Sequence, residues 1–160
     1  NTRDISNKEI KDKYKYAAVA IGNNKIRFQL LNKLKINDFK VPSLIHPTAI
    51  ISPSSNINEG CVIFAKSVIQ AEVNIGFGVI INTSCSIDHE CIIEECAHIC
   101  PGAHLAGRVS IGQLSTVGIG ASVIQDIKIG DQVFIGAGSA VINNIEDKMT
   151  VAGVPAKLIK

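Results

Sequence analysis

The feature that most constrains the fold is a repeat of six residues. Starting at Ile45, every sixth position up to Val141 is Ile, Leu or Val. A second series lies four residues after each of these and holds only small or β-branched residues, from Ala49 to Ile145. A period of six fits neither an α-helix nor an alternating strand. It predicts a triangular coil of short strands and turns, in which three hexads make one turn of about 18 residues.

The composition agrees with such a coil. Hydrophobic residues make up 46% of the chain and aromatic residues 4%, so the core must consist of small and branched aliphatic side chains. Each coil buries its face on the next, because stacked coils extend three parallel sheets. The register runs from 45 to 145 without an insertion, which predicts nearly six coils. Cys61, Cys85 and Cys91 fall on the small inward series, and we interpret them as packing residues.

The hexads are the signature of left-handed parallel β-helix proteins. The predicted fold class is therefore mainly β, with a β-helix domain over residues 44–160. Residues 1–43 lack the hexads and are predicted to form a separate, small and apparently truncated α/β lobe.

The N-terminal lobe carries a strand pattern followed by a helix pattern. The stretch "YKYAAVAIG" (14–22) is predicted to be a buried strand. The next stretch, "NNKIRFQLLNKLK" (23–35), predicts a helix with Asn23 or Asn24 as its N-cap. Its apolar face is expected to hold Ile26, Leu30, Leu31 and Leu34. Upstream, "SNKE" (6–9) has the form of a capping box that opens a short helix.

A strand, a glycine turn and a helix form half of a nucleotide-binding unit. Gly22 permits the tight turn, and the helix N-terminus behind it attracts anions. The lobe is also basic, with ten Lys or Arg against four Asp or Glu over 1–43, whereas 44–160 hold six and ten. A basic lobe suits an anionic substrate, although a solvated surface is the simpler interpretation.

The charge, the hydrophobic pattern and the cysteine usage argue against several kinds of partner and location. The net charge of +2 is too small to suggest a nucleic-acid partner. No run of 18 apolar residues occurs, so no membrane partner is expected. The five cysteines form no CxxC pair and no secretory signal is present, which predicts a cytoplasmic protein.

The most polar interruption of the repeat is "DHE" (88–90). The repeat puts His89 near a corner, with Ala71 one coil before it and Gly107 one coil after it, so small neighbours leave a notch around the imidazole. His98 follows nine residues later, half a perimeter away, and walls of roughly 15–20 Å keep the two histidines apart in one chain. If both serve one site, two chains must supply them. This predicts an oligomer, most simply a homotrimer with sites in the clefts between prisms.

Five stretches resemble a known family: "AIGNNKIR" (20–27), "HPTAIISPS" (46–54), "DHE" (88–90), "AHICPGAHLAG" (97–107) and "VAGVPAK" (151–157). The chain is similar to sugar acetyltransferases related to bacterial bacillosamine and perosamine N-acetyltransferases and sialic-acid O-acetyltransferases. The resemblance implies an acetyl-CoA-dependent enzyme that N-acetylates a nucleotide-linked amino sugar of the UDP-4-amino-sugar type and needs no metal. The family's GxGGHG-like nucleotide loop is not in this sequence, so residues before Asn1 are expected to complete that pocket.

The same resemblance implies two catalytic roles. His89 matches the general base, because an amine that attacks a thioester must lose a proton and histidine is suited to accept one near neutral pH. Glu90 matches the acid that raises the basicity of this histidine, since a carboxylate favours the imidazolium. Asp88, on the other side of His89, is a second carboxylate for that role.

The resemblance also implies binding residues. His98 matches a residue that lines the acetyl-CoA site, and the Gly107 N–H resembles the donor to the thioester carbonyl. Ile119, in "TVGIGA" (116–121), and Gly136 and Ala137, in "FIGAGSA" (134–140), lie in stretches that resemble the borders of the pantetheine groove. Gly22 matches a glycine that contacts the nucleotide-sugar.

Three alternatives remain open from the sequence. The first is O-acetylation of sialic acid or another glycan, which the same base can support. The second is a zinc lyase of the γ-carbonic-anhydrase type, which needs three converging histidines. His98 and His104 are six residues apart and therefore a wall apart, which disfavours it. The third is a noncatalytic solenoid, which has no need of "DHE" beside a glycine notch.

Overall fold

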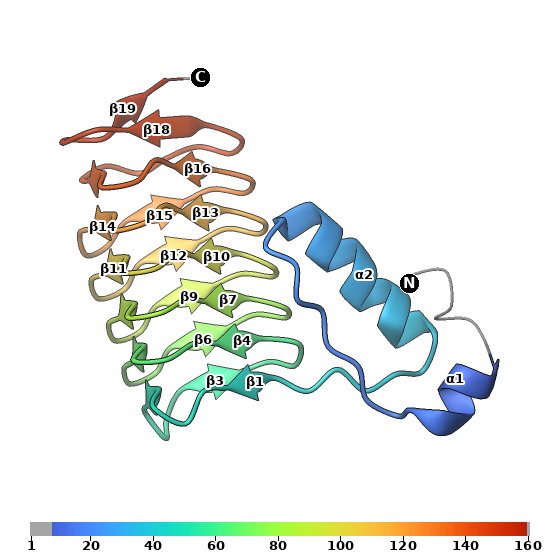
Figure 1. Cartoon of the computed structure of the whole chain (residues 1–160). Helices are drawn as coiled ribbons and strands as arrows, with labels where there is room; N and C mark the ends of the chain where they lie inside the picture. The colour runs from blue at the N-terminus through green and yellow to red at the C-terminus, as the bar shows by residue number, and fades with distance from the viewer. Residues whose placement is uncertain (1–7, 160) are drawn as a thin grey trace.

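The hexad repeat folds into a three-walled parallel β-solenoid of about six turns, preceded by two helices (Figure 1). The structure is a computed structural model, and it describes residues 8–159. The predicted mainly β fold is confirmed. The first solenoid strand begins at Leu44 and the last strand ends at Leu158.

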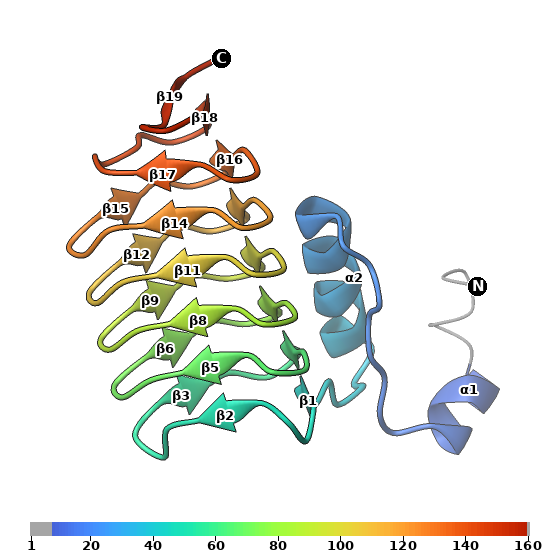
Figure 2. The same cartoon turned by 60° about the vertical axis from the view of Figure 1, so that its left-hand side comes forward.

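Each wall is one sheet whose strands come from successive coils, as Figure 2 shows. Wall 1 contains β1 (Leu44–Ile45), β4 (Val62–Ile63), β7 (Ile80–Ile81), β10 (His98–Ile99), β13 (Thr116–Val117), β16 (Phe134–Ile135), β18 (Thr150–Ala152) and β19 (Lys157–Leu158). Wall 2 contains β2 (Ile50–Ile51), β5 (Val68–Ile69), β8 (Ser86–Ile87), β11 (His104–Leu105), β14 (Ser122–Val123) and β17 (Ala140–Val141). Wall 3 contains β3 (Asn56–Ile57), β6 (Asn74–Ile75), β9 (Ile92–Ile93), β12 (Ser110–Ile111) and β15 (Lys128–Ile129). We name each corner by the two walls that it joins.

The register between neighbouring strands is 18 residues. Ile63 pairs with Ile81 and Ile81 with Ile99, so the first inward series stacks into continuous aliphatic columns. Every member of that series from Ile63 to Val141 is at most 2% exposed. Ile45 is 48% exposed, because its coil is the first and has no coil below it. The predicted core is confirmed apart from that end.

The cysteines of the second series pack inside the coil, as predicted. Cys61, Cys85 and Cys91 are at most 1% exposed, and each thiol contacts a backbone carbonyl of the coil above. Burial raises the pKa of the Cys85 and Cys91 thiols to about 11. These thiols therefore stay protonated at neutral pH and are unreactive.

At each corner the chain turns at one residue whose backbone lies in the left-handed region, and this residue recurs once per hexad. Every sixth residue from Gly60 to Gly138 has a positive φ, between 51° and 74°. Glu90 is one of them, with φ 59°. Repetition of the same turn stacks equivalent corner residues 18 positions apart, which is how the fold brings side chains from different coils together.

The predicted helix is confirmed, but its buried face differs from the prediction. α2 (Asn24–Ile36) has Asn23 as its N-cap, and Asn23 Oδ1 accepts the Ile26 N–H at 3.0 Å. The helix packs along the corner between walls 3 and 1. Its buried residues are Asn24, Arg27, Leu31 and Leu34.

The prediction that Ile26 and Leu30 lie on the buried face of the helix is wrong, because Ile26 is 46% exposed and Leu30 is only half-buried. The reason is the surface that α2 meets. The corner presents backbone carbonyls of successive turns, and these take up the polar Asn24 and Arg27 in place of an aliphatic stripe.

The predicted buried strand over 14–22 is wrong. Within the described residues this segment makes one parallel β-bridge, between Tyr16 and Lys40, and otherwise runs as irregular chain. Tyr14 and Tyr16 are more than half exposed, because no second strand covers them. The described part of the lobe is therefore helical and not α/β.

The short helix expected near the N-terminus is α1 (Lys8–Lys13). Ser6 and Asn7 of the predicted capping box lie outside the described residues. Neither α1 nor α2 has the length and apolarity that a membrane span requires.

Candidate functional site

His89 lies at the corner between walls 2 and 3, directly after β8. Its Nδ1 is 2.9 Å from Glu90 Oε2, and its side chain is 45% exposed. A carboxylate at this distance accepts the Nδ1–H and fixes the ring, so the neutral imidazole presents Nε2 as an acceptor. The structure therefore brings together the predicted base and its predicted carboxylate partner.

Gly107 lies in the equivalent turn one coil later, and the imidazole fills the space over it. A Cβ built on Gly107 would lie 2.5 Å from His89 Nε2, so any side chain here would displace the ring. This is the notch that the 18-residue spacing predicts. Among the hydrogen bonds of residues 8–159, the Gly107 N–H has no acceptor.

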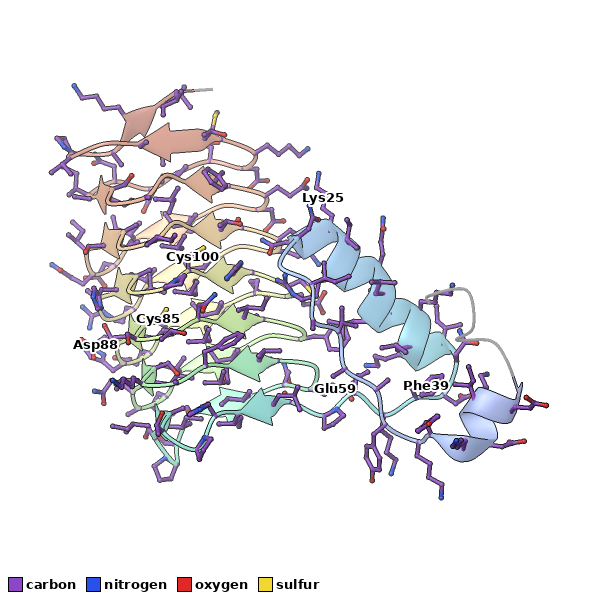
Figure 3. All side chains as sticks on the ribbon, viewed as in Figure 1. Lys25, Phe39, Glu59, Cys85, Asp88 and Cys100 are labelled. Atoms are coloured by element: carbon purple, nitrogen blue, oxygen red, sulfur yellow. The ribbon has the colours of Figure 1, made fainter. Side chains whose placement is uncertain are left out.

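Asp88, the second carboxylate beside His89, contacts the backbone of the turn and not the imidazole. Asp88 Oδ1 accepts the backbone N–H of His89 at 2.9 Å, which is a local turn bond. Figure 3 shows Asp88 on the side of the solenoid away from α2. The imidazole Nδ1–H donates to the Glu90 carboxylate, whereas Asp88 bonds the backbone of the turn.

A second ion pair supports this corner from the coils above. Arg108 Nε and Nη2 donate to the two carboxylate oxygens of Asp126 at 2.6 and 3.0 Å. Arg108 Nη1 also lies 4.0 Å from Glu90 Oε2. These three side chains occupy equivalent corner positions on successive coils, and they are all about half exposed.

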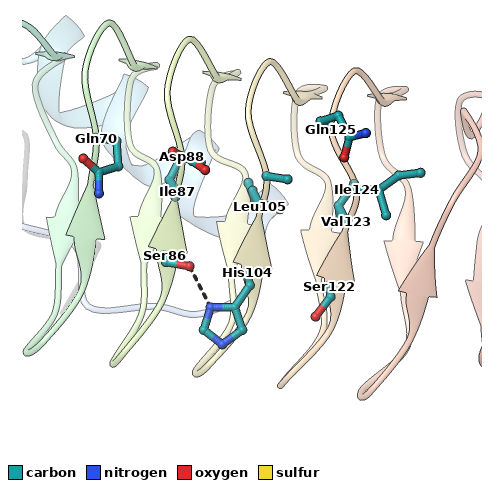
Figure 4. Close-up of a pocket in the computed structure, with 11 residues that line it drawn as sticks. Gln70, Ser86, Ile87, Asp88, His104, Leu105, Ser122, Val123, Ile124 and Gln125 are labelled. Carbon is teal, nitrogen blue, oxygen red and sulfur yellow. Dashed lines mark hydrogen bonds between the residues drawn. The ribbon is translucent and has the colours of Figure 1, made fainter.

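A groove of about 440 Å³ lies on the outer face of wall 2, beside the His89 corner (Figure 4). Within it, Ser86 Oγ is 2.7 Å from His104 Nδ1, across one coil. Other polar lining residues are Gln70, Asp88, Ser122 and Gln125. Sequence analysis missed this groove, although the 18-residue spacing of Ser86 and His104 could have indicated the pair.

His98 lies on wall 1, in β10, and is half-buried. Asn82 Nδ2 donates to His98 Nε2 at 3.1 Å. Burial, together with the nearby Arg27 guanidinium, lowers the pKa of His98 to about 4. His98 is therefore neutral at physiological pH. Asn82 was missed by the sequence analysis, since no residue pattern links it to a histidine 16 positions away.

The three remaining residues expected at the acyl donor lie at the corner between walls 1 and 2. Ile119 is 60% exposed, Ala137 is exposed and Gly136 is half-buried. A Cβ on Gly136 would lie 2.7 Å from Ala152 Cβ, so this position is closely packed against the next coil. The corner is lined by small residues, because Gly120 and Gly138 stack beside them with φ near 65°.

The chain separates the two halves of the expected site. His89 lies at the corner between walls 2 and 3, and that corner faces wall 1, which carries His98 across the prism. Gly22 lies at the start of α2, along the third corner. One chain therefore does not bring His89 together with His98, Ile119, Gly136 and Ala137.

The histidines do not form a zinc site within one chain. His98 and His104 lie on walls 1 and 2, and residues 8–159 contain no group of three metal-ligating side chains.

Comparisons with known proteins agree with this geometry. No model of a known protein family matches the chain. The acetyltransferase domain of PglB from Neisseria gonorrhoeae FA1090, solved with acetyl coenzyme A, is 45% identical, with a TM-score of 0.89 over 90% of this chain and 70% of that one. PerB from Caulobacter crescentus, solved with CoA and GDP-perosamine, is 34% identical, with a TM-score of 0.96 over 99% of this chain and 76% of that one.

A curated relative is the GDP-perosamine N-acetyltransferase of Escherichia coli O157:H7, which is 28% identical over 111 residues. The match covers 69% of this chain and 50% of the relative, so the chain spans half the length of that protein.

The fold and the corner site define a hexapeptide-repeat β-helix protein. Within that class, the chain belongs to the family of sugar N-acetyltransferases that includes the PglB acetyltransferase domain and perosamine N-acetyltransferase. The resemblance in the sequence motifs is confirmed.

Proposed function

We propose that this protein is an acetyl-CoA-dependent N-acetyltransferase of a nucleotide-linked amino sugar, of the UDP-4-amino-sugar type. The observation that carries the proposal is the His89–Glu90 pair, whose free Nε2 lies over the backbone of Gly107. The named relatives support it, since they are acetyltransferases solved with acetyl-CoA or with CoA and GDP-perosamine.

In the proposed reaction, the sugar amine attacks the carbonyl carbon of the thioester, and a C–N bond forms. The amine proton moves to His89 Nε2, and Glu90 stabilises the resulting imidazolium. The Gly107 N–H donates a hydrogen bond to the carbonyl oxygen as negative charge develops on it. This N–H has no other acceptor within residues 8–159. The C–S bond then breaks, and the imidazolium returns the proton to the CoA sulfur.

The acyl donor is proposed to lie in the cleft between two copies of the chain. One copy supplies His89, Glu90 and Gly107, and the neighbouring copy supplies His98, Ile119, Gly136 and Ala137. A closed ring of three copies makes three such clefts from a single interface, which is the simplest symmetric solution. We therefore propose a homotrimer, with Gly22 of the lobe at the nucleotide-sugar. Wall 3 carries Lys128 at an outward strand position, in β15, whereas the outward strand positions of walls 1 and 2 carry no Lys, Arg, Asp or Glu up to β17, which supports walls 1 and 2 as the paired faces.

A thiol-release assay tests the activity. Protein is incubated with acetyl-CoA and, in turn, a UDP-linked amino sugar, a GDP-linked amino sugar and free sialic acid. We expect release of CoA thiol with a nucleotide-linked amino sugar and formation of an N-acetyl product. Release with sialic acid alone would support O-acetyl transfer instead, and stoichiometric zinc in metal analysis, without thiol release, would favour the lyase class.

A further inference from the structure

Arg27 is the largest fully buried polar side chain in the described part of the protein. Its side chain is 0% exposed, yet the hydrogen bonds of its guanidinium go to neutral groups. Burial of a cation is costly unless each donor has an acceptor. Burial lowers the pKa of Arg27, but an arginine remains charged in proteins. A charge held at this cost needs a role beyond filling space.

The guanidinium joins two parts of the molecule. Its Nε and Nη2 donate to backbone carbonyls at the turns of two successive coils, Gly78 at 2.8 Å and Cys96 at 2.7 Å. Its Nη1 donates to the carbonyls of Ile21 and Gly22 at 3.2 and 3.0 Å. Arg27 therefore ties the loop before α2 to the solenoid.

We call the hydrogen bonds of Arg27 to the loop and to the coils the clamp. Asn24 extends this clamp by one coil. Its Nδ2 donates to the Leu114 and Ser115 carbonyls at 2.9 and 3.1 Å and to Thr116 Oγ1 at 3.0 Å, while its Oδ1 accepts from Arg27 Nη2. Thr116 is the strand partner of His98. The clamp thus contacts both coils that flank the wall position of His98.

The clamp joins the coil turns to the Ile21–Gly22 loop, and these two parts differ in how many other hydrogen bonds hold them in place. The coil turns have their own ladder, in which Cys96 N–H donates to Phe77 at 2.7 Å and Gly78 N–H to Glu59 at 3.1 Å. Upstream of the loop, the Ala17 N–H donates to the Lys40 carbonyl at 3.0 Å and the Lys40 N–H to the Lys15 carbonyl at 2.9 Å. Downstream, Asn23 caps α2. No other backbone bond is found for Ile21 and Gly22 in the described residues. Loss of the guanidinium should therefore release the loop and leave the coils in place.

We infer that Arg27 is a positioning residue that fixes the Ile21–Gly22 loop against the wall that carries His98. The inference rests on the proposed function, because it assigns Gly22 to the nucleotide-sugar side of the reaction. Arg27 sets the sugar-binding loop and the acyl-donor wall at a fixed distance, without itself contacting a substrate. Lysine is not an equivalent residue here, since one ammonium has three donors and lacks the planar fork that reaches both sides.

The test compares Arg27→Met with Lys25→Met. Lys25 is exposed on the same helix, so its substitution removes the same charge without touching the clamp (Figure 3). For Arg27→Met we expect the KM for the nucleotide-linked amino sugar to rise about tenfold or more, with the KM for acetyl-CoA and kcat changed less than about threefold. Arg27→Lys should lie between Arg27→Met and the unmodified protein. Lys25→Met should behave as the unmodified protein.

Amide hydrogen exchange gives a readout that does not need activity. In Arg27→Met, amides over 17–24 should exchange faster, while amides of the coils over 60–140 keep their protection. Equal loosening of loop and coils, or an equal rise of both KM values, would overturn the inference and show a purely structural residue. If Arg27→Met does not fold, the same exchange comparison is made on Arg27→Lys.

The two proposals fail separately. If the unmodified protein releases no thiol with any amino sugar, the proposed function fails, and exchange over 17–24 still decides the role of Arg27 in holding the loop. If thiol is released but the loop exchanges alike in both Met variants, the function stands and the inference about Arg27 fails.

Discussion

At the scale of single residues, the chemistry depends on which nitrogen of His89 is free. The Glu90 carboxylate 2.9 Å from Nδ1 selects the tautomer in which Nε2 carries a lone pair. That nitrogen lies over Gly107, where a Cβ would come within 2.5 Å of it. The absence of a side chain at position 107 therefore keeps both the ring and the backbone N–H open to a substrate.

We predict that His89→Ala lowers kcat by about 10²- to 10⁴-fold, the usual contribution of a general base. The side chain is half exposed, so the thermal unfolding midpoint should change little. Thiol release measures the rate. His46→Ala, an exposed histidine at the corner between walls 1 and 2, is the matched control. A rate near that of the unmodified protein would refute the assignment of His89 as the base.

Glu90→Gln should lower the rate less than His89→Ala, because the imidazole stays in place but loses the carboxylate that stabilises its protonated form. The pH profile of kcat/KM should change as well, because the carboxylate no longer acts on the ring. The measurement is thiol release between pH 5 and 9. An unchanged profile would show that Glu90 does not act through His89.

His98 makes stability depend on pH in a known direction. Its pKa is about 4 in the folded protein and 6.5 in an unfolded chain, so the unfolded state binds more protons between these values. The free energy of unfolding should therefore fall as the pH falls from about 6.5 to about 4. His98→Gln should flatten this slope, measured as the urea midpoint at pH 7, 5.5 and 4.5. His46→Gln should keep it, and equal slopes in all three proteins would contradict the prediction.

At the scale of elements, α2 is attached through the corner of the solenoid and not through a sheet of its own. Leu31 packs against the Gly78 turn, and Leu34, Phe39, Val41 and Cys96 complete this small core. A glycine is required at position 78 for two reasons, its backbone conformation and the lack of space for a side chain. Its φ is 66°, and a Cβ would lie 2.5 Å from Leu31 Cδ1 and 2.7 Å from Cys96 Sγ.

Gly78→Ala and Gly102→Ala separate these two requirements. Both glycines have φ near 65°, but a Cβ on Gly102 meets nothing within 4 Å. Gly102→Ala should cost about 1–2 kcal/mol from the left-handed backbone alone. Gly78→Ala should cost about 1–3 kcal/mol more, because α2 must move away from the corner. Denaturant unfolding measures both, and equal losses would show that α2 does not depend on this contact.

Sequence periodicity predicts the elements that repeat and fails for those that do not. The hexads specify walls, corners and core, because each coil sees the same surroundings as the one before it. Residues 14–22 have strand propensity, but a strand needs a neighbour, and in the described residues Lys40 is their one bridge partner. The inward orientation of Arg27 also follows from tertiary structure, since its acceptors belong to turns 51 and 69 residues away.

The site follows the same division. His89, Glu90 and Gly107 are predictable, because neighbours in sequence and an 18-residue step bring them together. The contact of Asn82 with His98 depends on rotamers that the repeat does not specify, whereas the 18-residue spacing of Ser86 and His104 indicates that pair.

At the scale of the whole molecule, the central feature is the distance between the two halves of the site. His89, the proposed base, and wall 1, which carries His98, lie on opposite sides of one prism, so the proposed site requires a neighbouring copy. Sedimentation should give about three times the 17.0 kDa chain mass, since a ring of three closes the interface. A stable monomer with full activity would contradict the composite site.

Subunit mixing tests this account most directly. His89→Ala removes the base, and Ala137→Trp blocks the acyl-donor groove at an exposed position, so each protein alone should be nearly inactive. When the two are unfolded together in equal amounts and refolded, about a quarter of the clefts should pair an intact His89 with an intact groove from the next copy. We predict that thiol release returns to about a quarter of the unmodified rate. Mixtures that stay as inactive as the separate variants would show that each chain builds its site alone.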